Sequence, residues 1–185
     1  MNSFRPTPDE VVQPAGIGAA EKSSSRWRVR EATPGDVDDI VAMAHELAAY
    51  EKAPDECTLT SAQLSAALFG PAPAVFGHVV SRDDDPAVVG FAVWFLNFST
   101  WRGVHGIYLE DLYVRPEARG GGAARALLSR LARICQERGY ARLEWWVLDW
   151  NTPARDAYAA MGAHALTDWI PYRVDGAELA RLADN

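Results

Sequence analysis

The sequence has few cysteines and no histidine cluster. Cys57 and Cys135 are its two cysteines, and neither belongs to a C-x-x-C or Cys/His spacing that would bind a metal ion. Two reduced thiols, as in a cytosolic protein, are the simpler interpretation. The four histidines show no ligand spacing either. We therefore expect no metal site.

Long apolar runs and excess positive charge are also missing. No run approaches the roughly 20 residues of a membrane-spanning helix, and the first residues lack the basic start and apolar core of a signal peptide. We therefore expect a cytoplasmic protein with no membrane partner. The formal net charge is −7. This balance argues against nucleic-acid binding, because phosphate contacts need a basic face, and it suits a small cationic molecule better.

The length and composition predict one folded domain. A chain of 185 residues, 49% hydrophobic, can bury one core and is too short for two ordinary domains. Residues 1–25 are rich in Pro, Gly, Ala and Ser without a periodic pattern, so we expect a disordered N-terminal tail there. The domain is expected over residues 26–185.

Hydrophobic periodicity predicts both strands and helices. Helices are expected at 33–48, 60–68, 120–139, 152–161 and 176–183. Strands are expected at 27–29, 75–81, 88–98, 106–114, 143–148, 164–169 and 172–174. This order predicts an α/β domain with a mixed central sheet.

A glycine-rich turn stands between the strand that ends at Val114 and the helix that follows. Gly120, Gly121 and Gly122 let the backbone approach a ligand closely, and the first N–H groups of a helix attract a pyrophosphate. The turn is no P-loop, because Ala123-Ala124 stand where Lys-Ser/Thr would follow, and it comes too late in the chain for a Rossmann fingerprint. Taken alone, turn geometry explains these glycines as well as a ligand does.

Three segments together resemble the GNAT family of N-acetyltransferases. Arg119–Ala124 is similar to the family's acetyl-CoA loop, Arg/Gln-x-x-Gly-x-Gly/Ala, and Arg30–Asp36 is similar to its opening. Trp150–Ala154, followed by Ala157–Ala163, resembles its later Asn-x-x-Ala/Ser…Tyr…Gly segment. The resemblance covers residues ~26–175 in the family's order and implies the GNAT fold, a mostly antiparallel mixed sheet flanked by helices.

The resemblance also implies a binding mode for acetyl-CoA as co-substrate. The strands that carry Glu110 and Trp145 would splay apart, and the pantetheine arm would lie between them. A bulge at Asp111–Tyr113 would leave a backbone N–H free to meet the thioester oxygen. The expected contacts to acetyl-CoA are Leu112, Tyr113, Val114, Arg119, Gly120, Gly121, Gly122, Ala123, Ala124, Arg125, Asn151, Ala154 and Tyr158.

A narrower resemblance is to the diamine branch of the family, which acetylates spermidine, spermine or thialysine. It rests on Glu46–Glu51, Val89–Ala92, Tyr108–Asp111 and Trp150-Asn151, and the sequence departs from it after Gly162. There Asp168 alone could replace an acidic substrate contact. The resemblance implies a homodimer with the amine site near its interface. The expected substrate contacts are Tyr50, Glu51, Glu110, Asp111, Glu144, Trp145 and Trp146.

The chemistry assigns roles to three of these side chains. A primary amine has a pKa of ~10.4, so a positioned base must remove its proton near neutral pH. Glu110 is the expected base and Asp111 the second choice. Alternatively, both could simply lie at the end of the strand, hydrogen-bonded to the backbone. Tyr158 matches the family's tyrosine acid, which protonates the leaving thiolate; without the surrounding motif it would be a core tyrosine.

Other activities stay open at this point. The amine could belong to an aminoglycoside, an amino acid or a protein N-terminus. The chain could also bind acetyl-CoA without turnover, although Glu110, Asn151 and Tyr158 argue against that. Asp55 and Glu56 are expected to lie on a solvated acidic surface.

Overall fold

A single mixed sheet forms the centre of the domain. The computed structural model describes residues 26–184, so the tail predicted at 1–25 lies outside the described residues. The five strands lie in chain order, and all neighbours are antiparallel except β4 and β5, which are parallel. The strands are β1 (Trp27–Glu31), β2 (Phe76–Arg82), β3 (Val88–Ser99), β4 (Val104–Val114) and β5 (Leu143–Glu144).

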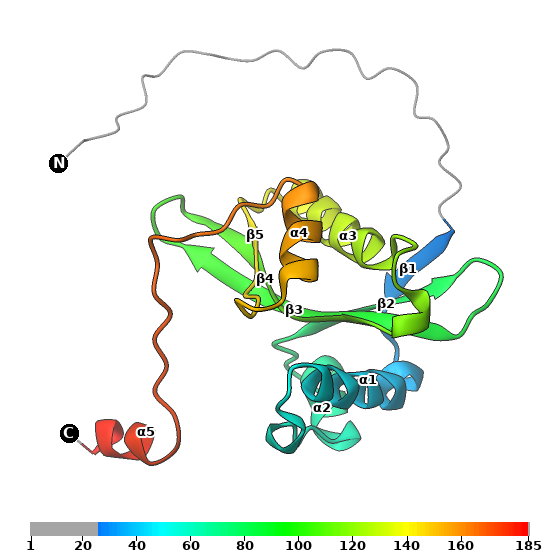
Figure 1. Cartoon of the computed structure of the whole chain (residues 1–185). Coiled ribbons are helices and arrows are strands. Elements are labelled where there is room, and N and C mark those ends of the chain that lie inside the picture. Colours follow the sequence, from blue (N-terminus) through cyan, green and yellow to red (C-terminus); the bar gives the residue numbers. More distant parts are fainter. Residues whose placement is uncertain (1–25, 185) are drawn as a thin grey trace, which may run out of the picture.

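Helices cover both faces of this sheet, so the molecule has three layers. Figure 1 shows α3 and α4 on one face and α1 and α2 on the other. The helices are α1 (Val37–Tyr50), α2 (Ser61–Phe69), α3 (Ala123–Arg138), α4 (Thr152–Ala160) and α5 (Gly176–Ala183). Short 3-10 turns stand at Pro34–Asp36, Pro54–Glu56 and Pro116–Ala118. The mixed α/β architecture that the sequence predicts is confirmed.

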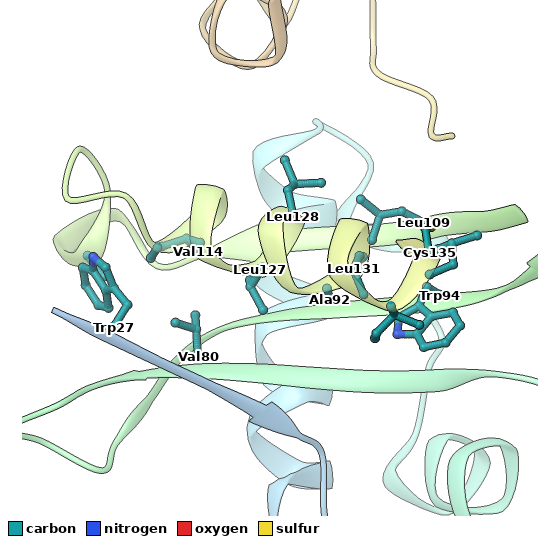
Figure 2. Packing of buried hydrophobic residues seen from close by; sticks show 14 residues of the cluster. Trp27, Val80, Ala92, Trp94, Leu109, Val114, Leu127, Leu128, Leu131 and Cys135 are labelled. Carbon is teal, nitrogen blue, oxygen red and sulfur yellow. The ribbon is translucent and has the colours of Figure 1, made fainter. Parts of the chain in front are cut away.

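Each face of the sheet has its own hydrophobic cluster. On the α3 face, Leu127 and Leu131 are fully buried against strand residues that include Ala92 and Leu109, as Figure 2 shows. On the other face, α1 and α2 pack against alternate residues of the same strands, with Phe91 at the centre. Strand residues alternate between the two clusters because successive side chains of a strand point to opposite faces. This two-sided burial fixes the register of the sheet.

The start of α1 is tied to the first strand by a partly buried charge pair. The Arg30 guanidinium donates two hydrogen bonds to the Asp36 carboxylate, each 2.7 Å long. These bonds, with those from Thr33, lower the pKa of Asp36 to about 2. The same carboxylate accepts from the Thr33 backbone N–H and hydroxyl, which closes a capping box. The predicted helix start at Thr33 is therefore confirmed, with a 3-10 turn before α1.

The structure corrects the sequence prediction at the C-terminal end of the fold. The strand predicted at 143–148 is limited to Leu143–Glu144, and the strands predicted at 164–169 and 172–174 do not form. The apolar pattern was right for a strand, but a strand also needs a neighbour for its backbone groups. No helix within residues 26–184 is long and apolar enough to cross a membrane.

Candidate active site

A bulge in β4 lies at the first of two consecutive carboxylates, Glu110 and Asp111. Asp111 is paired with Val93 and Leu109 with Trp94, so the register with β3 skips Glu110. The bulge therefore lies at Glu110 and not at Asp111–Tyr113, where the sequence placed it. A bulge inserts one extra residue and changes which face the following side chains point to. Leu109 and Leu112 both pack on the α3 side, so the extra residue is accommodated between them.

Asp111 lies in the larger of two pockets of the site. This pocket has a volume of about 460 Å³ and opens between the end of α1, the 3-10 turn at Pro54–Glu56 and β4. Three of its lining residues are acidic, namely Glu51, Glu56 and Asp111. The remaining lining residues are mostly small or apolar: Ala44, Leu47, Ala48, Cys57, Thr58, Leu59 and Gln63. Such a pocket attracts a cation with an alkyl chain, because the acidic groups hold the charge and the apolar wall covers the chain.

The environment of Asp111 makes its carboxylate a better proton acceptor. Burial is the largest cause, and the negative charges of Glu110 and Glu51 add to it, so the pKa of Asp111 is raised to about 6. Partial desolvation also raises the pKa of Glu51. A carboxyl with a pKa of about 6 is still largely ionised at neutral pH and binds a proton more tightly than a free aspartate does. Asp111 therefore has the acid–base properties that the sequence analysis sought first in Glu110.

Tyr158 lies on α4 and faces the same group of charges. Its ring packs edge-on against Trp145, with 4.9 Å between the ring centroids. Burial, and then the charge of Glu51, raise the pKa of its phenol. A phenol with a raised pKa stays protonated at neutral pH and can serve as a proton donor. Tyr158, Glu51 and Asp111 come from three different elements, and the fold brings them within electrostatic reach of one another.

The strands β4 and β5 diverge beside these side chains. They pair only at Ile107–Leu143 and Tyr108–Glu144. From Leu109 to Val114, β4 is hydrogen-bonded to β3 on one edge, and no strand within residues 26–184 pairs with its other edge. The open edge offers backbone N–H and C=O groups to an extended ligand, which can bind as an added strand would. The arrangement matches the splayed strand pair that the resemblance implied.

The glycine turn leads from the end of β4 into α3. Gly122 is the residue before the helix and has a φ of 92°, in the left-handed region that favours glycine. No side chain caps the start of α3, so its first N–H groups point outward with their partial positive charge. The open edge of β4 and this uncapped helix start are the two parts that the sequence predicted would hold the pantetheine and the pyrophosphate of acetyl-CoA.

Arg119, in the glycine turn, and Asn151, before α4, both contact Tyr50. Arg119 donates a 2.8 Å hydrogen bond from Nε to the Val114 carbonyl oxygen, and its guanidinium stacks on the rings of Tyr50 and Tyr113. The side-chain oxygen of Asn151 caps α4 by accepting from the Ala154 N–H at 3.4 Å. The same oxygen accepts from the Tyr50 hydroxyl at 3.2 Å. Tyr50 therefore spans from the glycine turn to the start of α4.

The other residues that we expected to contact acetyl-CoA or the amine lie in different surroundings. Leu112 packs on the α3 side, while Ala123 is buried at the start of α3, Ala124 is half-buried and Arg125 is exposed. Trp146 lines the second pocket, of about 310 Å³, together with Phe95, Tyr108, Glu110 and Arg173. The Glu144 carboxylate instead accepts from Asn97 at 2.7 Å and pairs with Arg142 at 2.9 Å, and it lines neither pocket.

Two charged residues of the pockets were missed by the sequence analysis. Glu56 is exposed, as expected of a surface acid, yet it lines the larger pocket together with Asp111. The sequence signal for Glu56 was its position in the short connection between the helices predicted at 33–48 and 60–68. Arg173 reaches the second pocket from the segment after Gly162, where the resemblance had no counterpart for it. In residues 26–184 no group of three or more His, Cys, Asp or Glu side chains is placed to hold a metal ion.

Comparison with known proteins agrees with this geometry. Residues 40–163 match the acetyltransferase (GNAT) family. The chain is 37% identical over 164 residues to the thialysine N-epsilon-acetyltransferase of Bos taurus, covering 84% of this chain and 96% of that protein. It is 27% identical to the L-ornithine N5-acetyltransferase of Arabidopsis thaliana, covering 96% of this chain and 95% of that protein.

A solved structure shares the fold as well. An integron cassette protein from the mobile metagenome of V. cholerae superimposes with a TM-score of 0.71 at 26% identity. The match covers 86% of this chain and 99% of that one. The sequence motifs, the splayed strands and both kinds of comparison lead to one conclusion: the chain belongs to the GNAT family of acetyltransferases.

Proposed function

We propose that this acetyl-CoA-dependent N-acetyltransferase acetylates one primary amine of a small molecule that carries a second amine, such as a diamine, a polyamine or a thialysine-like amino acid. The observation that carries the proposal is the larger pocket, where Glu51, Glu56 and Asp111 surround a partly apolar space. The two enzymes compared above, which are named for thialysine and L-ornithine, support the same substrate class.

The acidic residues would divide two tasks between them. An ammonium group held near Glu51 and Glu56 would keep its proton and anchor the substrate. The amine at Asp111 would lose its proton before attack. At pH ~7.4 only about one primary amine in a thousand is neutral, and removing the proton costs about 4 kcal/mol. Asp111, with a pKa of about 6, or its neighbour Glu110 would accept that proton directly or through water.

The remaining groups would act on the other reactant. Acetyl-CoA supplies the acetyl group as a thioester that a neutral amine can attack directly. The open edge of β4 at Leu112–Val114 would hold the pantetheine, and the turn at Arg119–Arg125 would hold the pyrophosphate. Tyr158 would donate its proton to the departing sulfur, since its raised pKa keeps the phenol protonated at neutral pH.

Substrate selectivity tests the proposal. Each charge contact retained in a partly buried site contributes about 1.5–3 kcal/mol. Diamines, thialysine and L-ornithine should therefore exceed monoamines of equal length by roughly tenfold or more in kcat/KM. Glu51→Gln and Glu56→Gln should each reduce this ratio, as should raised salt. Asp55→Asn is the matched control, because Asp55 shares the 3-10 turn with Glu56 and does not line the pocket.

Two results would refute parts of the proposal separately. Equal kcat/KM for monoamines and diamines would remove the substrate assignment and leave the acetyltransferase. Tight acetyl-CoA binding without acetylation of any amine in the panel would remove the catalytic assignment for this chain.

A further inference from the structure

The end of α1 contacts the segment before α4, although these two helices cover opposite faces of the sheet (Figure 1). The Tyr50 hydroxyl donates to the side-chain oxygen of Asn151 at 3.2 Å. The Lys52 ammonium lies over the ring of Trp150, 4.6 Å from its centroid, and the Tyr50 ring lies 5.9 Å from the same ring. Because a sheet separates the two helical layers, such contacts can form only where no strand stands between them. This junction therefore passes the open edge of β4, where β5 has diverged.

The side-chain amide of Asn151 has protein partners on its oxygen only. Asn151 is buried, and its oxygen accepts from the Tyr50 hydroxyl and, at 3.4 Å, from the Ala154 N–H. Within residues 26–184 the NH2 group of Asn151 makes no hydrogen bond. Buried polar groups are normally paired. The NH2 group is therefore a donor that is available to an acceptor on a ligand.

The two donors decide which way this amide faces. The oxygen and the nitrogen of an asparagine exchange places when its side chain turns over, and the surrounding hydrogen bonds select one orientation. The bonds from Ala154 and Tyr50 are both at the long end of the usual range, so neither is strong alone. Together they hold the oxygen toward themselves and turn the NH2 group away from both.

The ring of Tyr50 makes a further contact, with the glycine turn. The Arg119 guanidinium lies over two rings, 5.2 Å from the centroid of Tyr50 and 5.3 Å from that of Tyr113. A cation is attracted to the face of an aromatic ring at such distances. The hydroxyl and the ring of one residue therefore contact the two segments that are expected to bind the pantetheine and the pyrophosphate.

We propose that Tyr50 is a positioning residue for acetyl-CoA and not a contact of the amine. Its hydroxyl fixes the Asn151 amide so that the NH2 group donates to an amide carbonyl of the pantetheine arm, and its ring holds Arg119 beside the pyrophosphate. Glu51, the next residue of the chain, lines the larger pocket, since adjacent residues near a helix end point in different directions. This role rests on the acetyl-CoA dependence of the proposed function and holds for any amine.

The test measures the binding of CoA and of its nucleotide part, 3′-phosphoadenosine 5′-diphosphate, to the full chain by calorimetry. Tyr50→Phe removes the hydroxyl and keeps the ring. It should raise the Kd of CoA roughly fivefold, the worth of one hydrogen bond, and leave the Kd of the nucleotide unchanged, because the nucleotide lacks the pantetheine arm. The KM of the amine should also stay unchanged. Tyr50→Leu removes the ring as well and should raise the Kd of both ligands.

A double-mutant cycle separates positioning from general packing. Asn151→Ser keeps an oxygen that can cap α4 and removes the NH2 group. In that background Tyr50→Phe should have no further effect on the Kd of CoA. Lys52→Gln is the matched control, because it removes the contact with Trp150 in the same junction and should leave the Kd of CoA unchanged. The melting temperature of each variant without ligand checks that it folds.

The proposal fails if Tyr50→Phe binds CoA as the wild type does, or if its effect and that of Asn151→Ser are additive. Equal losses for CoA and the nucleotide in Tyr50→Phe, or a loss in Lys52→Gln, would show that only the docking of α1 matters. A raised amine KM with an unchanged Kd of CoA would make Tyr50 a substrate contact. All of these results leave the proposed function standing, whereas a wild-type chain that binds no CoA would overturn both.

Discussion

The two edges of β4 show how one strand can serve both stability and chemistry. On the β3 side, ten residue pairs run from Gly90–Val114 to Ser99–Val104 and are interrupted only by the bulge. On the β5 side, two pairs form before the strands diverge. The closed edge belongs to a sheet buried between two helical layers. The open edge carries backbone groups and carboxylates that the fold leaves available. We therefore expect the closed edge of β4 to hold the open edge in place. Substitutions beside the closed edge should mainly change stability, and substitutions beside the open edge should mainly change ligand binding and turnover.

The largest effect on stability is expected on the closed side. Leu131 of α3 is fully buried against the sheet. Leu131→Ala should lower the free energy of unfolding by about 2–5 kcal/mol, because it removes buried methylenes and leaves a cavity. Urea denaturation measures this loss. Trp146→Ala, at an exposed position beside the open edge, is the comparison and should cost much less. Equal losses would show that both edges are equally structural.

Acetyl-CoA binding should depend on the turn that ends the open edge. At a concentration of 100 times Kd, a ligand stabilises the folded state by ~2.7 kcal/mol. Gly122→Val should abolish this gain in thermal shift experiments, since a side chain would stand at the helix start. Gly103→Val is the matched control: its φ of 67° is also positive, and it lies between β3 and β4. Both variants should lose some intrinsic stability. If Gly122→Val keeps the acetyl-CoA shift, the turn does not bind the pyrophosphate.

Proton donation should depend on Tyr158. Tyr158→Phe keeps the ring against Trp145 and removes the proton. The expected result is a ~10²-fold or larger decrease in kcat, with the acetyl-CoA thermal shift retained. Tyr140→Phe changes a half-buried tyrosine whose ring packs against His105, and it should leave kcat unchanged. If Tyr158→Phe keeps the wild-type kcat, Tyr158 is not the proton donor and serves only in packing.

The two sides should also differ in their response to pH. On the open side, burial and the charges of Glu110 and Glu51 raise the pKa of Asp111 in the folded protein from 3.8 to about 6. The folded protein therefore binds this proton more tightly, and the carboxylate costs stability above pH 6. Asp111→Asn should raise the free energy of unfolding at pH 8 by on the order of 2 kcal/mol. It should also remove the loss of kcat/KM as the pH falls through about 6. Unchanged stability and an unchanged pH profile would contradict this assignment.

On the closed side, folding stability should depend on pH in the opposite direction. His78 is buried, and its Nδ1 accepts a 3.1 Å hydrogen bond from Trp94. Burial lowers its pKa to about 4. Between pH 6.5 and 4 the unfolded chain binds a proton that the folded chain does not, so stability falls as the pH falls, by up to about 1.4 kcal/mol per pH unit. A His78→Gln variant should lose that slope, whereas His45→Gln, at an exposed position, should keep it.

The bulge in β4 could have been read from the sequence with closer attention to spacing. Ile107, Leu109, Leu112 and Val114 all pack on the α3 side. Their separations of two, three and two residues require one extra residue between Leu109 and Leu112. The sequence analysis used the acidic pair and the resemblance and placed the bulge one position too late. Glu110 and Asp111, on either side of this irregularity, line different pockets.

The sequence by itself determined the order of helices and strands as far as α4, the start of the first helix at Thr33, and the glycine turn before α3. These features depend on residues close together in the chain, through periodicity and local hydrogen bonds. Only the tertiary structure decided the roles of single side chains. Glu144 is engaged by Asn97 and Arg142, Glu56 lines the larger pocket, and the pKa of Asp111 is raised by its surroundings. Desolvation and charge act between groups that are distant in sequence, so no local pattern contains them. The same reason explains why β5 ends after two residues, because a strand continues only where another lies beside it.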